Sequence, residues 1–443
     1  MAVAPVGSLS KVDRLSSIHS LRRKLQDSAV AEYVAPDAPH WALEPFIPIT
    51  GEDLLTRLLE RDDLPPDRQG PLIQLSRTLD AVLYQDERKR YATLKNCYRA
   101  IDPDNELGCR VESEALVDEM QRMASNRLDQ GLIAAGFTSI SEAELQAATG
   151  IVSRWGVPLR VDFELYKILA MYSRGDVMGV RLLRPWSRPW RQDPVDVRLY
   201  QRVAIVFRLK QPLRGEEHLD PDCLHVRMYK NIPKTDIDML LPGSQVRLTW
   251  LDGTRIIMPS LGSIGMTIWK IIRTAILVAA ISMYTAVMIA GLLLLTVVYV
   301  ARAVFSYFQT RHKHMLNLTR SLYYQKIESN AGVIYSVLED ARQQRHAAQL
   351  LACYAFAMES SPLSRRRLKR RVERIIRELT AIEVDFQVDD VLEDMSRFGL
   401  IHWIERERRW QMLTLEKALA TLHQWWDAQP LEINRISTDD RGG

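Results

Sequence analysis

Two aspartates in the string Ile-Pro-Lys-Thr-Asp-Ile-Asp-Met-Leu-Leu-Pro are the residues best suited to acid chemistry. Asp236 and Asp238 stand two positions apart, between Pro233 and Pro242, and paired carboxylates can divide the roles of general acid and base. The same string also suits a short helix capped by Thr235 or Asp236, with its apolar side chains packed inward. The chain contains no GxSxG, HExxH, P-loop or GxGxxG pattern, so no catalytic residue is assigned and an enzyme is not favoured.

Metal binding is not indicated either. Asp102-x-Asp104-x-Glu106 begins like a calcium loop, but Leu107 and Ser113 occupy positions that need Gly and Glu, so a turn is expected. The pair His312 and His314 has no carboxylate or cysteine at a ligand spacing. The cysteines at 97, 109, 223 and 353 form no CxxC pair, which predicts no zinc module, no disulfide scaffold and a reducing compartment. We therefore expect no metal and no cofactor.

Residues 364–377 form a strongly basic helix with eight cations and one carboxylate. Nucleic acid is disfavoured, because the helix before the expected hairpin carries Asp389, Asp390, Glu393 and Asp394, which repel phosphate. Contact with anionic lipid or a protein partner remains, and so does a plain solvated face. The residues expected to bind an anionic surface are Arg366, Lys369, Arg370, Arg374 and Arg377.

An uncharged run of 28 residues, 274–301, is long enough as a helix (about 42 Å) to cross a hydrocarbon core of about 30 Å. Cations flank it on both sides in near-equal number, which favours a transmembrane helical hairpin at 264–308 over one span at 274–301. Membrane lipids are then partners, in a bacterial inner membrane or, in a eukaryote, a mitochondrial membrane. The expected interfacial residues are Trp269, Lys270, Arg273, Arg302, Tyr307, Arg311 and Lys313.

Composition agrees with a folded chain. At 443 residues, about three domains are expected, and 47% hydrophobic content is too high for a mostly disordered protein. A net charge of +4 excludes a strongly basic nucleic-acid coat protein.

The order of patterns predicts an α+β membrane protein. Helical spacing dominates 51–158, and period-two alternation in 159–263 predicts antiparallel strands in a small α+β domain. Helix, helix, helix and hairpin follow one another in 343–430, which is the order of a winged-helix-like domain. The expected divisions are a flexible 1–50, then 51–158, 159–263, the membrane segment 264–308, a juxtamembrane helix 309–342, the domain 343–430, and a disordered tail 431–443.

The string from Val226 to Pro242, with Tyr166–Gly175 and the stretch from Leu322 to Gly332, resembles the transmembrane protein 143-like family, an uncharacterised membrane protein family of bacteria, plants and animal mitochondria. The resemblance covers about residues 75–420 and implies two closely spaced membrane helices, but no reaction. The residues that carry it are Asn231, Pro233, Asp236, Asp238, Pro242, Tyr323, Tyr324 and Asn330.

These observations together predict an integral membrane protein whose cytoplasmic or matrix domains act as an interaction or scaffold module. The alternatives are a membrane-bound hydrolase using Asp236 and Asp238, and a membrane-tethered winged-helix regulator. The sequence does not identify a protein partner or an oligomeric state.

Overall fold

The fold comes from a computed structural model of the chain. The structure describes residues 32–33, 38, 40–61, 63–105, 114–141, 144, 159–160, 162–183, 193–213, 219–243, 245–246, 269, 326–359 and 361–428. The chain divides into two compact units. The first comprises Met1–Ser141, Leu165–Pro233 and Ile327–Gly443, and the second comprises Glu142–Glu164 and Lys234–Lys326.

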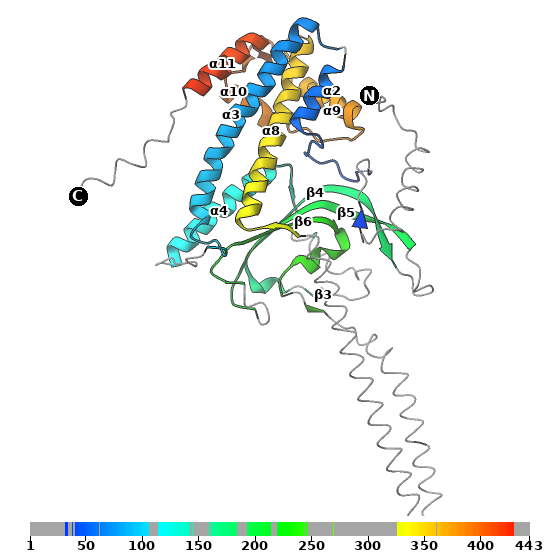
Figure 1. The fold of residues 1–443 in the computed structure, drawn as a ribbon, viewed down its shortest axis with the longest axis vertical. Helices are drawn as coiled ribbons and strands as arrows, with labels where there is room; N and C mark the ends of the chain where they lie inside the picture. The colour runs from blue at the N-terminus through cyan, green and yellow to red at the C-terminus, as the bar shows by residue number, and fades with distance from the viewer. Residues whose placement is uncertain are drawn as a thin grey trace, which may run out of the picture. The chain divides into compact units, whose positions relative to one another are not determined.

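The first unit contains an antiparallel sheet with the strand order β1-β4-β5-β6-β8, in which β2 also pairs with β4 (Figure 1). The two long strands β4 and β5 pair from Tyr166↔Leu209 to Leu183↔Asp193. Five consecutive residues of β5, 203–207, are all buried, so both faces of this strand are covered. The strand bounds are β1 Glu32–Tyr33, β2 Thr138–Ser139, β4 Tyr166–Leu183, β5 Asp193–Leu209, β6 His225–Pro233 and β8 Lys326–Ser329.

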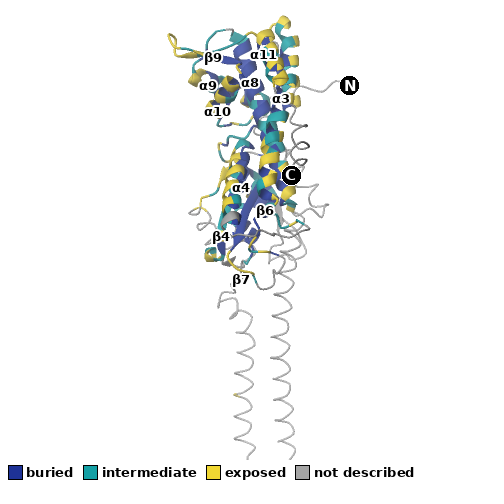
Figure 2. Cartoon of the chain, turned by 90° about the vertical axis from the view of Figure 1, so that its left-hand side faces the viewer, coloured by how far each residue is buried: buried dark blue, intermediate teal, exposed yellow. Residues whose placement is uncertain are grey.

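Long helices pack on this sheet and extend beyond it. Helices α3 and α8 lie side by side, and α4 packs against both (Figure 1). Burial follows their inner faces, while exposed residues lie on the outside of α3, α4 and α11 (Figure 2). The bounds are α2 Gly51–Leu59, α3 Pro66–Tyr98, α4 Glu114–Ala134, α8 Ala331–Glu359, α9 Arg365–Thr380, α10 Val388–Arg397 and α11 Leu415–Asp427.

Helix α8 belongs to two hydrophobic cores. Its first part, with Val333 and Val337, packs with the strands and α4, and its last part, with Leu351 and Phe356, packs with α2, α9, α10 and α11. Between the two lies a polar belt containing Arg342, Arg345, His346 and Gln349. Helix α8 thus runs through both cores, as α3 does, and its central turns carry buried polar groups.

The C-terminal elements follow one another as helix, helix, helix and hairpin. After α8 come α9, α10 and the antiparallel pair β9 (Ile401–Ile404) and β10 (Arg409–Met412), and α11 follows. Leu363, between α8 and α9, forms an antiparallel bridge with Trp410 of β10. This bridge fixes the start of α9 beside the hairpin.

The second unit is described only in part. Strand β3 (Leu159–Arg160) pairs antiparallel with β7 (Gln245–Val246), and the short 3-10 helix η2 covers Lys234–Leu240. A further 3-10 turn, η1, covers Phe163–Leu165. Residues 247–263, where the sequence predicts further strands, lie outside the described residues.

The membrane architecture expected from the sequence is corrected. Among the helices that the structure describes, none is both long and apolar enough to cross a bilayer. The physical reason is visible in α8, whose 29 residues include Glu339, Asp340, Arg342 and Arg345. The segment 264–308 itself lies outside the described residues apart from Trp269, which is helical and exposed. The described chain is a mixed α/β protein. The described helices do not support the expected integral membrane location or a function that depends on it.

The structure contains a disulfide, although the sequence predicts no disulfide scaffold. Cys223 is disulfide-bonded, whereas Cys97 and Cys353 are free. Burial raises the pKa of the Cys353 thiol to about 12, which makes that thiol unreactive at neutral pH.

The polar belt of α8 predicts a dependence of stability on pH. Burial lowers the pKa of His346, whose Nε2 lies 3.0 Å from the carbonyl oxygen of Ser76, and burial lowers the pKa of His40 and His225 in the same direction. In the unfolded chain a histidine titrates near 6.5, so below that pH the unfolded state binds more protons than the folded state.

The free energy of unfolding should therefore be highest at neutral pH and fall as the pH drops through about 6.5, the pKa of a histidine in the unfolded chain. In the variant His346→Gln this fall should be shallower, because one of the three histidines whose pKa is lowered by burial is removed. Urea denaturation at several pH values measures it. Equal slopes in the variant and the natural protein would contradict the assignment.

Candidate functional site

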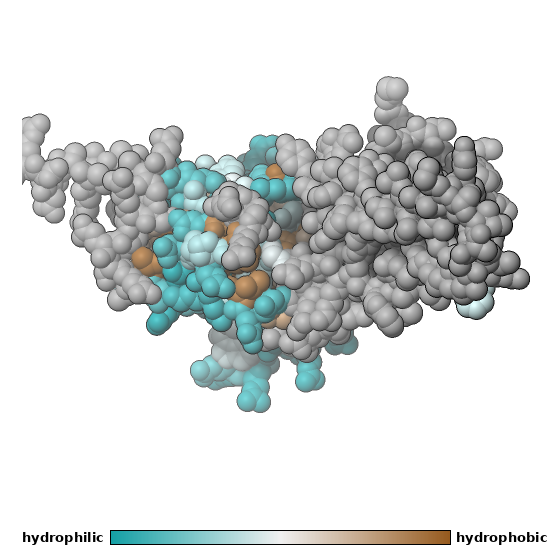
Figure 3. All heavy atoms as spheres, turned by 90° about the horizontal axis from the view of Figure 1, so that it is seen from below, coloured by the Kyte–Doolittle hydropathy of each residue, from teal (hydrophilic) through white to brown (hydrophobic). Residues whose placement is uncertain are grey.

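Most of the described surface seen in Figure 3 is hydrophilic, with hydrophobic side chains scattered over it. The C-terminal elements combine several exposed arginines with exposed indoles. Helix α9 buries Leu368, Val372, Ile375 and Ile376 and turns its cations outward. This amphipathic pattern accounts for the basic run in the sequence.

Five of the eight cations on α9 are neutralised by nearby carboxylates. Arg365 pairs with Asp389, Arg367 and Arg371 share Glu359, Lys369 pairs with Asp385, and Arg377 pairs with Glu383. The hydrogen bond to Asp385 also raises the pKa of Lys369.

The other three are Arg366, Arg370 and Arg374, which are exposed and have no carboxylate partner among the described residues. They are spaced by four residues, so they lie on one face of the helix. We call them the arginine stripe.

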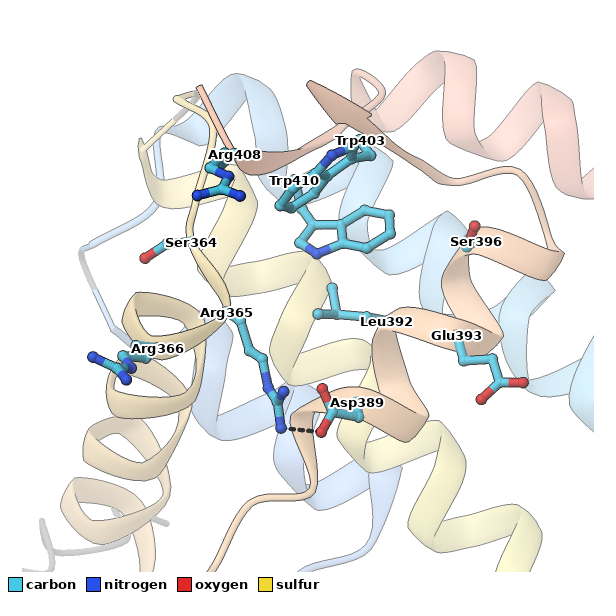
Figure 4. A pocket seen from close by; sticks show the side chains of 10 residues that line it. All are labelled: Ser364, Arg365, Arg366, Asp389, Leu392, Glu393, Ser396, Trp403, Arg408 and Trp410. Carbon is cyan, nitrogen blue, oxygen red and sulfur yellow. Dashed lines mark hydrogen bonds and ion pairs between the residues drawn. The ribbon is translucent and has the colours of Figure 1, made fainter. Parts of the chain in front are cut away.

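The stripe begins at a groove of about 690 Å³ between α9, α10 and the hairpin (Figure 4). The indoles of Trp403 and Trp410 meet at one end with ring centroids 5.1 Å apart, and Leu392 of α10 lies between them and Asp389. Trp403 is 45% exposed, so a large part of its indole is open to solvent at the groove. The groove therefore offers a concave apolar surface.

Charge is divided between the two sides of the groove. Arg365, Arg366 and Arg408 line one side, and Asp389 and Glu393 of α10 line the other. The Arg365–Asp389 ion pair crosses the groove, while Arg366 points outward at its rim (Figure 4). Ser364 and Ser396 also line it, but no histidine or cysteine does, so the groove lacks a nucleophile with an adjacent base. Its chemistry is that of binding.

The position of α10 depends on a buried ion-pair network centred on Arg345 of α8. The Nε of Arg345 donates to Asp394 of α10 at 2.8 Å, and its Nη1 donates to Asp86 and Glu87 of α3. Burial alone would lower the pKa of Arg345, but the hydrogen bond to Asp394 and the charges of the three carboxylates outweigh it and raise the pKa. Arg397 adds a second link from α10 to Asp86.

The structure separates the five cations predicted to bind an anionic surface. Arg366, Arg370 and Arg374 form the stripe, whereas Lys369 and Arg377 are occupied by ion pairs. Their closest carboxylate partners, Asp385 and Glu383, lie in the loop after α9, which sequence spacing did not reveal. The prediction of anionic binding itself remains untested.

The residues that carry the family resemblance have mainly structural surroundings. Asn330 has a left-handed φ of 52°. Its Oδ1 accepts a hydrogen bond from the backbone N–H of Val226, and its Nδ2 donates one to Asp104. Asn231 is also left-handed within β6, and Pro233 ends that strand. Tyr323 and Tyr324 lie outside the described residues.

The expected acid pair does not form a described site. Asp236 is buried in η2 and accepts a hydrogen bond from Thr235, and Pro242 is buried after it. The side chain of Asp238 lies outside the described residues. No cluster of three metal-ligating side chains occurs in the part of the chain that the structure describes. The two alternatives, a membrane-bound hydrolase and a membrane-tethered regulator, both require a membrane anchor. They are not supported, because no described helix can cross a bilayer.

The interfacial residues Lys270, Arg273, Arg302, Tyr307, Arg311 and Lys313 lie outside the described residues. So do His312 and His314. Asp102 and Asp104 form a turn in which the Asp104 amide donates to Asp102 Oδ1 at 3.0 Å.

Sequence reasoning missed the apolar half of the site. The sequence predicts a hairpin after the third helix of 343–430, but nothing in the spacing of Trp403 and Trp410 shows that Leu392 faces them. The aromatic pair directly across an antiparallel register, Trp403↔Trp410, is the signal that could have drawn attention to it.

Comparison with known proteins gives one match. The model of a family described as "Protein of unknown function (DUF3754)" matches residues 200–332, well under half of the chain. No curated protein and no solved structure matches the chain. The match includes β6 and Asn330 but not the groove, and it provides no link to the transmembrane protein 143-like family, so that resemblance remains a proposal.

The Arg345 network gives a direct prediction about stability. Arg345→Met would leave Asp86, Glu87 and Asp394 without their shared cation, and removing one partner of a buried ion pair costs about 3–5 kcal/mol. Arg365→Met is the matched control, because its pair with Asp389 is exposed and is worth about 0–1 kcal/mol. Urea unfolding followed by circular dichroism compares the two. Similar losses would show that the network does not hold α10.

Proposed function

We propose that this chain is a binding protein whose C-terminal elements recognise an acidic protein segment with one large apolar side chain. The observation that carries the proposal is the arginine stripe, which has no carboxylate partners among the described residues and begins at the tryptophan-lined groove. We interpret the elements from α8 to β10 as winged-helix-like, because Leu363 bridges the hairpin that follows the third helix.

The dimensions suit an extended peptide. From Arg366 to Arg374 the helix rises about 12 Å, which is the span of about four extended residues. A segment that places its apolar side chain against Trp403 and Leu392 can then lay alternate carboxylates along the stripe. Burying the anchor contributes about 1.5–3 kcal/mol, whereas each exposed ion pair contributes about 0.2–1 kcal/mol. The anchor is therefore the largest single contribution to the affinity, and the stripe adds selectivity and dependence on salt.

Other occupants fit less well. Duplex DNA would meet four carboxylates on α10, the helix that precedes the hairpin. A lipid surface is flat, so it would contact the stripe but leave the groove empty, and Glu393 on the far rim would repel its headgroups. A peptide satisfies both the concave apolar part and the separated charges.

The test measures binding of a fluorescein-labelled peptide of glutamates with one central phenylalanine to the full-length chain. The triple variant Arg366→Glu, Arg370→Glu, Arg374→Glu should weaken binding by about tenfold or more, because three attractions become repulsions. Binding by the natural protein should also weaken when salt is raised from about 0.05 M to about 0.3 M. Fluorescence anisotropy gives the dissociation constants.

Arg88→Glu, Arg122→Glu, Arg127→Glu is the matched control, with the same change of charge at exposed positions on α3 and α4. A second pair tests the anchor: Trp403→Ala should weaken binding, and Trp426→Ala, at a similarly exposed tryptophan of α11, should not. If a variant and its control weaken binding equally, in either pair, the peptide does not bind in the groove. If the chain binds phosphatidylserine vesicles or duplex DNA more tightly than the peptide, the occupant of the site is a lipid surface or DNA and not a peptide.

A further inference from the structure

A second cavity, a cleft of about 620 Å³, lies in the first unit on another side of α10. Its walls come from the loop before α2, the C-terminal end of α4, the polar belt of α8 and α10. Most of the apolar lining comes from Ile47, Ile133, Ala348, Phe386 and Val391. A volume of this size accommodates a small organic molecule.

Two of the three carboxylates that line the cleft have no cation partner among the described residues. Arg90, Arg345 and Arg397 line it, but these three arginines are already paired with Asp86, Glu87 and Asp394.

Asp390 and Glu393 also line the cleft, and neither has a cation partner among the described residues. Counted with Asp86 and Glu87, which pair with these arginines but do not line the cleft, three cations meet five carboxylates, so two negative charges are left over. Partial desolvation, together with the charges of Asp389, Asp394 and Glu393, raises the pKa of Asp390, so a positive ligand would relieve this repulsion.

A buried acceptor provides an independent observation. Gln349 lines the cleft with only 1% of its surface exposed, and its Nε2 donates to Asp394 at 3.1 Å. Its Oε1 has no hydrogen-bond partner among the described residues, although buried amide oxygens nearly always have one. Arg345 Nη2 is likewise buried without an acceptor. An N–H donor beside the cleft would satisfy the first group, and a carboxylate would satisfy the second.

We propose that this cleft binds a small aliphatic ammonium compound. Its ammonium group would lie between Asp390 and Glu393, and its methylene chain would pack against the apolar lining. A free diamine and a basic amino acid share this chemistry, and only the amino acid adds a carboxylate for Arg345. The proposal does not depend on peptide binding in the groove, since apart from Glu393 the two cavities have different linings.

The experiment titrates the full-length chain with cadaverine and with lysine, which share the same five-carbon chain and differ by a carboxylate. Choline at the same ionic strength serves as a cation that lacks an N–H donor. Calorimetry should show binding of cadaverine, lysine or both, and tighter binding of lysine would identify the basic amino acid as the ligand. Failure of both to bind, or equal binding of choline, would overturn the proposal.

Two variants place the binding in the cleft. The double variant Asp390→Asn, Glu393→Gln should weaken it by about tenfold, whereas Glu60→Gln, Glu416→Gln, which removes two exposed carboxylates elsewhere, should leave it unchanged. Ile133→Arg puts a cation at the exposed mouth of the cleft and should also weaken binding, with Met123→Arg on the same helix as its control. Equal affinity in a variant and its control would show that the ligand binds elsewhere.

Discussion

The arrangement of the helices depends on the ion pairs made by the buried guanidinium of Arg345. It lies in the polar belt between the two cores of α8 and joins Asp86 and Glu87 of α3 to Asp394 of α10. Because these charges are largely shielded from water, separating any pair would leave an uncompensated buried charge, and this cost holds each side chain in place. Helix α10 is therefore fixed relative to the long helices, and with it one wall of the groove and one wall of the cleft.

The two cavities follow from an unequal distribution of charge between neighbouring helices. Carboxylates around α9 neutralise five of its cations and leave the arginine stripe, while α10 keeps Asp390 and Glu393 without cation partners among the described residues. The positive excess lies beside indoles and the negative excess lies beside aliphatic side chains. One pair of helices can thus present sites for ligands of opposite charge without a catalytic group in either.

How far the sequence predicted this arrangement depends on the range of the interactions. Period-two alternation predicted β4, β5 and β6, and the run of cations predicted α9, because these patterns are local. The role of Arg345 was not predictable, since Glu87 stands 258 positions away and a cation inside a helix usually marks a solvated face. The pairing of Lys369 with Asp385 depends on how the loop after α9 folds back. The membrane expectation rested on an apolar run outside the described residues, and the described helices do not support it.

The central claim is that an acidic segment places its apolar side chain in the groove between α9, α10 and the hairpin. The most direct measurement uses the acidic peptide with a photoreactive benzoyl group on its central phenylalanine. Irradiation of its complex with the full-length chain is followed by mass spectrometry of the cross-linked residues. The account predicts cross-links to Trp403, Trp410 and Leu392, which excess unlabelled peptide abolishes. Cross-links concentrated on α4 or the sheet would contradict it, as would cross-links that unlabelled peptide does not reduce.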